Sequence, residues 1–240
     1  MKQSQNILWI ETIAAALGEE LRSKFVFTGG SVVELYYQRP ALPEPRVTKD
    51  VDAIVSAATL VEYYRVEAEL QKRGFVNAGL HGKKGPTCRY EYNGITFDVM
   101  PTEERVLGLS NRWFNHAMEN PIASRLPSGN VIRLASFPRF LAIKLETLAD
   151  RGGKDIRGSH DLEDIVRLVS GRLDPLAEIN RDTDEIKSFL QASTKSFFEK
   201  HNFIEAIEAS SQLGMEQTDR VTRVMEALAR GLEKKNRLER

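Results

Sequence analysis

The chain has 240 residues, and its 34 Lys and Arg residues balance its 34 Asp and Glu residues, so the formal net charge is zero. This balance excludes an overall basic surface for bulk nucleic-acid binding, so any anion site has to be a local patch. Hydrophobic residues make up 41% and charged residues 28%, a globular mix that excludes disordered and fibrous classes. One cysteine, Cys88, excludes an internal disulfide and a cysteine-based zinc cage.

The first residues show neither a signal peptide nor a membrane span. The apolar runs Ile7–Ile10 and Ile13–Leu17 are short, and Glu11 separates them. We therefore expect a soluble, cytoplasmic protein that does not contact a membrane.

The first part of the chain mixes helix and strand patterns. Apolar periodicity and glycine and proline breaks predict, in chain order, a helix, a strand, a helix, a strand and a helix, over residues 5–22, 25–27, 32–36, 51–55 and 59–72. Asn93-Gly94 between two apolar runs predicts a tight hairpin of residues 87–93 and 95–100. A second hairpin is expected from Ile122–Leu126 and Val131–Leu134.

The character of the sequence changes after Ser136. The remaining patterns all predict helices, over residues 136–149, 159–169, 183–200, 203–213 and 218–238. We therefore expect an α/β (α+β) protein with a mixed sheet in residues 1–135, followed by a helical bundle in residues 136–240. The boundary should lie near Ala135.

A glycine turn is the first feature that suggests chemistry. Thr28-Gly29-Gly30-Ser31 lies between a predicted strand and a predicted helix. Glycines let the backbone approach a ligand closely, and a helix N-terminus offers unpaired N–H groups to a phosphate. Ser31 could add a hydroxyl. A turn with no ligand is the plainer interpretation of the same residues.

Two carboxylates open the next predicted strand. Asp50 and Asp52 are two residues apart, so both side chains project from one face. Like charges side by side require a cation, and hard oxygen ligands suit Mg²⁺. The alternative is an acidic turn in which Asp50 caps the backbone and Asp52 is solvated.

Asp98 supplies a third carboxylate on a neighbouring strand. Ile95, Phe97 and Val99 alternate onto one face and leave Asp98 on the other, as is normal for a half-exposed strand. Together with Asp50 and Asp52, however, Asp98 would complete a site for two metal ions and a triphosphate.

This combination resembles the core signature of the polymerase-β-like nucleotidyltransferase superfamily. The resemblance implies that Gly29, Gly30 and Ser31 bind a nucleoside triphosphate and that the three acidic residues hold two Mg²⁺ ions. By the same resemblance, Asp98 would help to activate the attacking group.

A lysine interrupts the apolar face of the first helix after the boundary. Phe137, Leu141, Lys144 and Leu148 share one face at helical spacing. Lys144 could extend its ammonium group out of this face, but a phosphate as its target explains the position better. The basic, glycine-broken loop 150–158 follows, and it suits either a phosphate backbone or plain solvent.

Asp161 and Asp164 share one side of the next helix. N-terminal capping and solvation could explain both acids. Lys144, a basic loop and Asp161-x-x-Asp164 in that order nevertheless resemble the AbiEii-type branch of the superfamily, which includes toxins of type IV toxin–antitoxin and abortive-infection systems. The resemblance covers Phe25–Val169. It implies that Lys144 and Asp161 complete the active site, with Asp164 contacting the nucleotide.

We therefore expect an enzyme that moves NMP from an NTP to an acceptor hydroxyl and releases pyrophosphate. The resemblance favours the 3′ end of tRNA as acceptor and an antitoxin as partner. The alternatives are transfer to a protein hydroxyl, metal-dependent phosphodiester hydrolysis and a non-catalytic nucleotide-binding module. The basic residues available for an RNA groove are Arg133, Arg139, Arg151, Lys154 and Arg157.

Overall fold

The computed structural model describes residues 3–39, 42–78, 87–109, 111–151, 155–210 and 213–231. The chain divides into two compact units, one made of Met1–Tyr37 and Glu44–Ile143 and the other of Gln38–Pro43 and Lys144–Arg240. This division falls inside a helix, later in the chain than the expected change near Ala135. The assignment of separate functions to residues 1–135 and 136–240 stays a prediction.

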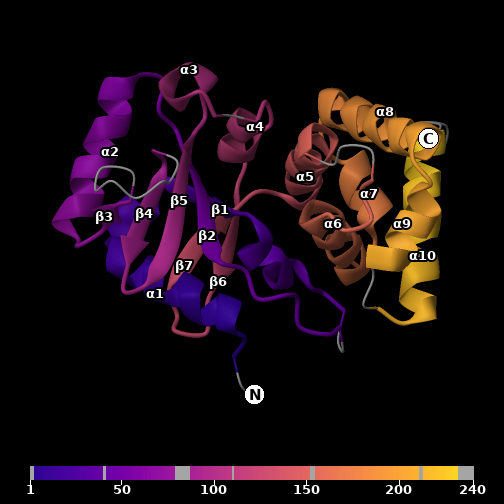
Figure 1. Cartoon of the computed structure of the whole chain (residues 1–240), viewed down its shortest axis with the longest axis horizontal. Coiled ribbons are helices and arrows are strands. Elements are labelled where there is room, and N and C mark those ends of the chain that lie inside the picture. The colour runs from indigo at the N-terminus through magenta and orange to yellow at the C-terminus, as the bar shows by residue number, and fades with distance from the viewer. Residues whose placement is uncertain are drawn as a thin grey trace, which may run out of the picture. The chain divides into compact units, whose positions relative to one another are not determined.

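Seven strands of the first unit form one mixed sheet in the order β3-β4-β5-β2-β1-β7-β6 (Figure 1). The strands are β1 (Phe25–Thr28), β2 (Asp50–Val55), β3 (Val76–Asn77), β4 (Arg89–Tyr92), β5 (Ile95–Pro101), β6 (Ile122–Arg125) and β7 (Val131–Leu134). The neighbours β2 and β5 are parallel, as are β1 and β7, and the other pairs are antiparallel. Both predicted hairpins are confirmed, and with them the mixed sheet.

Helices flank the strands of this unit. They are α1 (Gln5–Arg22), η1 (Gly30–Tyr36), α2 (Leu60–Lys72), α3 (Glu104–Leu107), α4 (Phe114–Glu119) and the beginning of α5 (Phe137–Arg151). The helix predicted after the glycines is η1, a 3-10 helix, whose tighter bonding suits a short connector. Thr59 caps α2 as its position suggests, because its hydroxyl accepts the N–H of Glu62.

The aromatic core of the first unit determines which face of β5 carries Asp98. The ring of Phe97 on β5 lies 5.7 Å from that of Phe25, 6.3 Å from that of Phe27 and 5.6 Å from that of Phe75, between centroids. Side chains alternate between the two faces of a strand. Burial of Phe97 among aromatic rings therefore directs its neighbour Asp98 to the opposite face.

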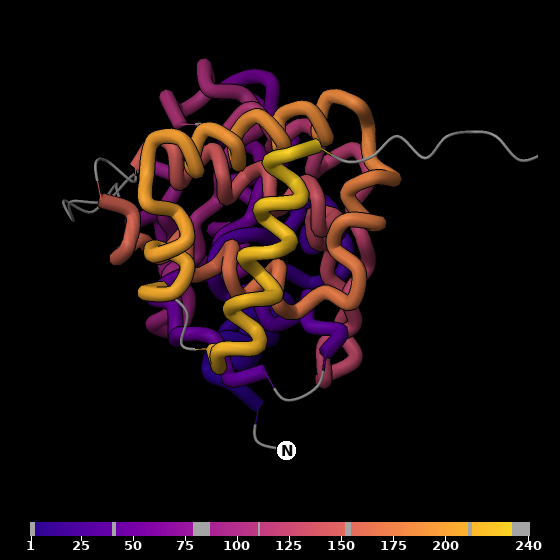
Figure 2. Tube along the Cα trace, turned by 90° about the vertical axis from the view of Figure 1, so that its right-hand side faces the viewer, coloured from indigo at the N-terminus to yellow at the C-terminus, as the bar shows by residue number. Residues whose placement is uncertain are grey.

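The second unit is helical. It contains the end of α5, α6 (His160–Gly171), α7 (Pro175–Asn180), α8 (Asp184–Lys200), α9 (Phe203–Ser210) and α10 (Met215–Arg230). Figure 2 shows α10 in yellow, and it contacts α6, α7, α8 and α9. Val221, Met225 and Leu228 of α10 are fully buried, so its apolar face is used inside this unit. The helical C-terminal part confirms the α/β (α+β) fold class.

Gln38 and Arg39 belong to the second unit and form backbone hydrogen bonds at the end of α6. The N–H groups of Gln38 and Arg39 donate to the carbonyl of Gly171, at 2.8 Å and 3.3 Å. Arg167 adds a bond from its guanidinium to the carbonyl of Pro43, at 3.2 Å. Within the described ranges, none of the helices has the length and apolar character needed to cross a membrane.

Candidate active site

Three carboxylates converge on one face of the sheet. The parallel register of β2 and β5 places Asp52 directly opposite Asp98, and Asp50 lies two residues before Asp52 on the same strand. One carboxylate oxygen of each residue lies within 4.8 Å of the others. The fold therefore brings together the three carboxylates that the alternation of strand residues predicts on one face. We call Asp50, Asp52 and Asp98 the carboxylate triad.

The glycine turn touches the triad directly. Gly29 has φ 78° and ψ −175°, a backbone conformation that side-chain-bearing residues rarely adopt. A Cβ atom on Gly29 would lie 1.9 Å from Oδ2 of Asp52, well inside van der Waals contact. Glycine is therefore required here for two reasons, the positive φ and the approach of Asp52.

Two hydroxyl groups beside this turn have no hydrogen-bond partner. Thr28 pairs with Asp52 across the antiparallel β1–β2 ladder, and Ser31 lies in the first turn of η1. Both side chains are buried, and neither Oγ1 of Thr28 nor Oγ of Ser31 is hydrogen-bonded. An unsatisfied buried hydroxyl costs about 1–3 kcal/mol, which a ligand that bonds to it can recover.

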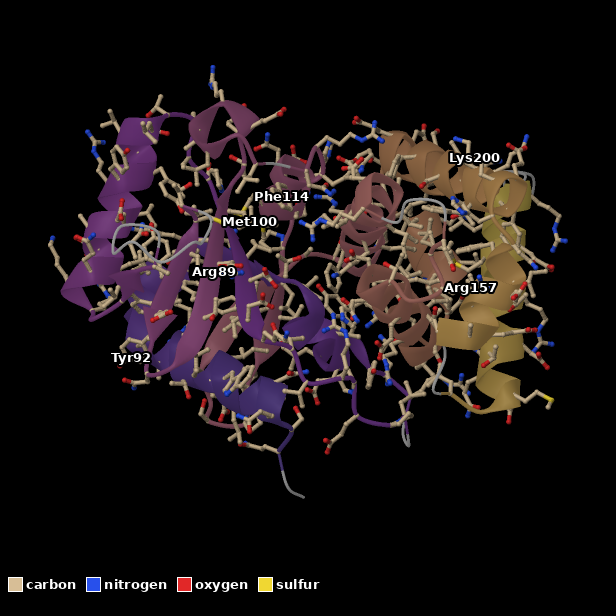
Figure 3. All side chains as sticks on the ribbon, in the orientation of Figure 1. Arg89, Tyr92, Met100, Phe114, Arg157 and Lys200 are labelled. Atoms are coloured by element: carbon tan, nitrogen blue, oxygen red, sulfur yellow. The ribbon has the colours of Figure 1, made fainter. Side chains whose placement is uncertain are left out.

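Arg89 on β4 is the site residue that the sequence reasoning missed. Its Nε donates to Oδ1 of Asp98 at 2.8 Å and its Nη2 to Oδ2 of the same carboxylate at 2.6 Å. The same Nη2 lies 3.7 Å from Oδ2 of Asp50. Figure 3 labels Arg89 over the strands of the sheet. The hydrogen bonds and charge of Asp98 raise the pKa of Arg89 against the effect of burial.

The hairpin itself could have revealed Arg89. Asn93 and Gly94 both have positive φ, as a two-residue turn of the primed type requires. Tyr92 then faces Ile95, and counting outward along both arms places Arg89 opposite Asp98.

The donor set of the triad fits a hard divalent cation. Carboxylate oxygens are the ligands that Mg²⁺ prefers, and Asp50, Asp52 and Asp98 supply them from two adjacent strands. The arrangement can therefore hold metal ions and, through them, a triphosphate.

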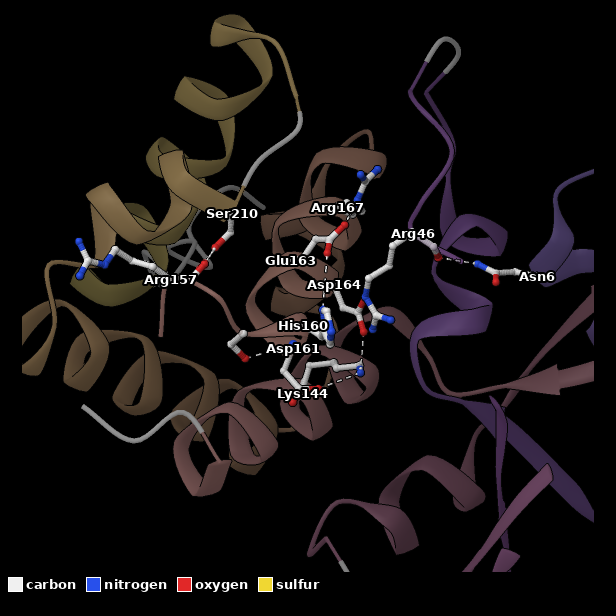
Figure 4. Close-up of polar contacts among 11 residues, drawn as sticks. Asn6, Arg46, Lys144, Arg157, His160, Asp161, Glu163, Asp164, Arg167 and Ser210 are labelled. Atoms are coloured by element: carbon white, nitrogen blue, oxygen red, sulfur yellow. Dashed lines mark hydrogen bonds and ion pairs between the residues drawn. The ribbon is translucent and has the colours of Figure 1, made fainter. Parts of the chain in front are cut away.

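A second polar cluster lies in the helical unit, where α5 meets α6 (Figure 4). Nζ of Lys144 lies 3.0 Å from Oδ1 of Asp161 and 2.8 Å from Oδ2 of Asp164. Lys144 and Asp164 are buried. Burial lowers the pKa of Lys144, but the charges of Asp164 and Asp161 and their hydrogen bonds outweigh it, so the pKa is raised overall. We call these three residues the lysine cluster.

The lysine cluster refines what the helical spacing predicted. Lys144 does interrupt an apolar face, and Asp161 and Asp164 do share one side of their helix. The lysine contacts both carboxylates at once, which the sequence pattern left open. Ser159 caps α6, because its hydroxyl accepts the N–H of Asp161.

A comparison with known protein families places these residues in context. Residues 14–236 match the family described as nucleotidyl transferase AbiEii toxin, type IV TA system. The chain belongs to the AbiEii family. The match extends beyond Phe25–Val169, the part that the motifs alone carried, and includes the C-terminal helices. The protein is therefore a nucleotidyltransferase of a toxin family. Comparison with curated proteins gave no match.

The basic residues expected to line an RNA groove differ in their surroundings. Arg133 and Arg139 donate hydrogen bonds to backbone carbonyls. Arg157 forms ion pairs with two carboxylates, while Arg151 is exposed. Lys154, like the glycines before it, lies outside the described residues. The role of these residues in an AbiEii-family protein stays a prediction.

Proposed function

We propose that this AbiEii-family protein is a Mg²⁺-dependent enzyme that transfers NMP from an NTP to a hydroxyl group. The acceptor oxygen bonds to the α-phosphorus, the bond from that phosphorus to the bridging oxygen of the β-phosphate breaks, and pyrophosphate leaves. The observation that carries this proposal is the convergence of Asp50, Asp52 and Asp98 within 4.8 Å, against a turn whose glycine leaves no room for a Cβ beside Asp52.

In this proposal the triad residues bind the metal and accept the proton of the acceptor hydroxyl. Bound Mg²⁺ would neutralise the triphosphate oxygens and favour ionisation of the acceptor hydroxyl. Asp50 and Asp52 supply oxygen ligands from one strand, and Asp98 supplies a ligand from the next. Asp98 also accepts the proton of the acceptor hydroxyl, directly or through water.

The glycine turn holds the outer phosphates. Gly29 and Gly30 let the backbone approach them, and Ser31 offers the buried hydroxyl that lacks a partner. On the resemblance to the family we further assign Lys144 to the charge that develops on the phosphates and Asp161 to the orientation of Lys144. The contact of 3.0 Å between these two residues supports the second assignment. Asp164 is assigned to the nucleotide on the same resemblance.

The acceptor we favour is the 3′ end of tRNA, and the outcome in the cell is growth arrest controlled by an antitoxin. The match to a type IV toxin–antitoxin family supports the toxin role. The tRNA acceptor rests on the resemblance described from the sequence.

A labelling experiment tests the proposal. The purified chain and Mg²⁺ are incubated with each α-³²P NTP in turn, together with total tRNA, with bulk cell protein, or alone. Asp52→Asn removes one triad charge, and Asp184→Asn makes the same change at an exposed position on α8. We expect label in the tRNA band for the wild type and Asp184→Asn, and a loss of about 1,000-fold or more for Asp52→Asn.

Each other result has a defined meaning. Label in a protein band replaces the RNA acceptor by a protein hydroxyl. Cleaved RNA without incorporated label indicates phosphodiester hydrolysis. Nucleotide binding without any product indicates a binding module. Undiminished transfer by Asp52→Asn contradicts the assignment of the triad.

A further inference from the structure

Arg89 is a cation that the chain itself places among the carboxylates of the triad. Three carboxylates within 4.8 Å repel one another. Arg89 lies opposite Asp98 in the β4–β5 ladder, so the backbone register delivers its guanidinium to this face. Its position is therefore as firmly determined by the hairpin as the position of Asp98.

Arg89 contacts Asp98 more closely than it contacts Asp50. Both Asp98 oxygens accept hydrogen bonds from Arg89, at 2.8 Å and 2.6 Å, in the bidentate geometry that makes arginine–carboxylate pairs strong. The approach to Asp50 is longer, at 3.7 Å, and is a charge contact without a hydrogen bond. A carboxylate retains further lone pairs when arginine uses one from each oxygen. Asp98 can thus keep Arg89 and still offer an oxygen to a metal ion.

We propose that Arg89 is a built-in counter-cation of the carboxylate triad: it holds Asp98 and Asp50 close to one another without metal, and a divalent cation has to displace it from Asp50 and share Asp98 with it. This inference rests on the metal site proposed above and adds a residue that sets its affinity. Arg89 weakens the binding of metal alone, because its positive charge lies where the ion has to enter. It is a positioning residue, since it acts through Asp98 and Asp50.

The test measures metal binding to the full chain without nucleotide, with Mn²⁺ as the probe in place of Mg²⁺. Arg89→Gln removes the charge and keeps a hydrogen-bonding side chain, and Arg89→Lys keeps the charge but loses the fork. Arg125→Gln is the matched control, because Arg125 lies on β6 at an edge of the same sheet and donates to the carbonyl of Gly129.

We expect Arg89→Gln to bind Mn²⁺ about tenfold more tightly than the wild type. Arg89→Lys should stay within about threefold of the wild type, as should Arg125→Gln. Arg89→Gln should also melt at a lower temperature in EDTA and gain more from saturating Mn²⁺ than the wild type does. A purely structural arginine would lower the melting temperature and leave the Mn²⁺ affinity unchanged, which would overturn the inference.

Asp52→Asn separates this inference from the function on which it rests. If the wild type and Arg89→Gln both fail to bind Mn²⁺, or if binding survives Asp52→Asn, the metal site itself is wrong. If Asp52→Asn abolishes binding while Arg89→Gln binds no more tightly than the wild type, the metal site stands and the counter-cation is overturned.

A measurement on the wild type covers the case in which Arg89→Gln does not fold. The Nε–H signal of Arg89, assigned by its loss in Arg89→Lys, should be protected from solvent exchange in metal-free buffer. Its chemical shift should change as metal is added, with the same midpoint as metal binding. Mg²⁺ is the ion to use here, because Mn²⁺ broadens the signal by its paramagnetism. A signal unchanged at saturating Mg²⁺ would refute the proposal.

Discussion

Two regions of the molecule gather carboxylates around a basic side chain, and they differ in their exposure to solvent. In the carboxylate triad Arg89 contacts Asp98 and Asp50, and the side chains of Arg89, Asp50 and Asp98 are 34%, 33% and 11% exposed. In the lysine cluster Lys144 contacts Asp161 and Asp164, and the side chains of Lys144, Asp161 and Asp164 are 9%, 15% and 1% exposed.

The difference separates a site that is partly exposed to solvent from one whose charged side chains are mostly buried. Exposure allows a diffusing cation to reach the triad, whereas the lysine cluster is closed by its own ammonium group. A nucleotide that uses Lys144 therefore has to share it with Asp161 and Asp164. The metal site that we propose uses the first region, and stability is the first property to test in the second.

The largest effect on stability is expected from Lys144→Met. The substitution keeps an unbranched chain of similar size and removes the ammonium group that contacts the carboxylates of Asp161 and Asp164. Removing one partner of a buried ion pair typically costs about 3–5 kcal/mol, and we expect a loss of this size in the free energy of unfolding by urea.

The matched control for this loss is Lys187→Met on α8. Lys187 forms an ion pair with Asp184, whose side chain is 95% exposed, so its loss should cost less than about 1 kcal/mol. Similar losses in the two variants would show that the lysine cluster is no more important for stability than a surface pair.

The next effect concerns the triad, through Gly29→Ala. The new Cβ would lie 1.9 Å from Oδ2 of Asp52, at a φ of +78°, so Asp52 has to move. We expect a stability loss of about 1–3 kcal/mol and a fall in transfer activity of about 100-fold, because displacement of a reacting group by about 1 Å has that effect.

Gly94→Ala is the matched control, because it has the backbone strain of a positive φ without a collision between the new Cβ and another side chain. Gly94 has a φ of +76°, and no atom lies within 4 Å of its added Cβ. This variant should lose about 1–2 kcal/mol and keep its transfer activity. If Gly29→Ala keeps full activity as well, the approach of the turn to Asp52 is unimportant for catalysis.

The sequence predicts the triad well because local rules with fixed periods place its members. Residues two apart on a strand share a face, which brings Asp50 and Asp52 together. The alternation of Phe97 and its neighbours then directs Asp98 to the same side of the sheet. Arg89 was missed because its position follows from cross-strand register rather than from a motif.

The lysine cluster shows where such rules stop. Helical spacing put Lys144 on the apolar face of α5 and placed Asp161 and Asp164 on one side of α6. Which of the two acids the lysine contacts depends on how α5 packs against α6, and no local period encodes that packing. The 3-10 form of η1 was likewise missed, because a seven-residue segment carries too few turns to distinguish helix types.

A smaller effect is expected in the pH dependence of stability, which tests whether Lys144 stays protonated. A lysine whose pKa is raised on folding contributes stability that is complete below its unfolded value of 10.5, and the contribution is lost as the pH rises through the folded value. The difference in unfolding free energy between the wild type and Lys144→Met should therefore be constant from about pH 6 to 9 and decrease only above about 10.5. A difference that already decreases between pH 7 and 9 would mean that burial outweighs the two carboxylates.

The smallest effect is expected on the reactivity of Cys88, the residue before Arg89. Its thiol pKa depends in part on the negative charge of Asp98. Burial, and then the charge of Asp98, raise the pKa of the Cys88 thiol to about 11. Only the thiolate is alkylated, so at pH 8 iodoacetamide should react at least about 100-fold more slowly with the folded chain than with the chain in urea. Asp98→Asn removes the smaller cause and leaves burial in place. It should raise the rate by less than about tenfold, whereas a rate equal to that in urea would mean that the variant exposes the thiol. A rate unchanged by Asp98→Asn would show that the negative charge of the triad does not affect the pKa of Cys88. Solvent would then screen this charge, because the triad is partly exposed.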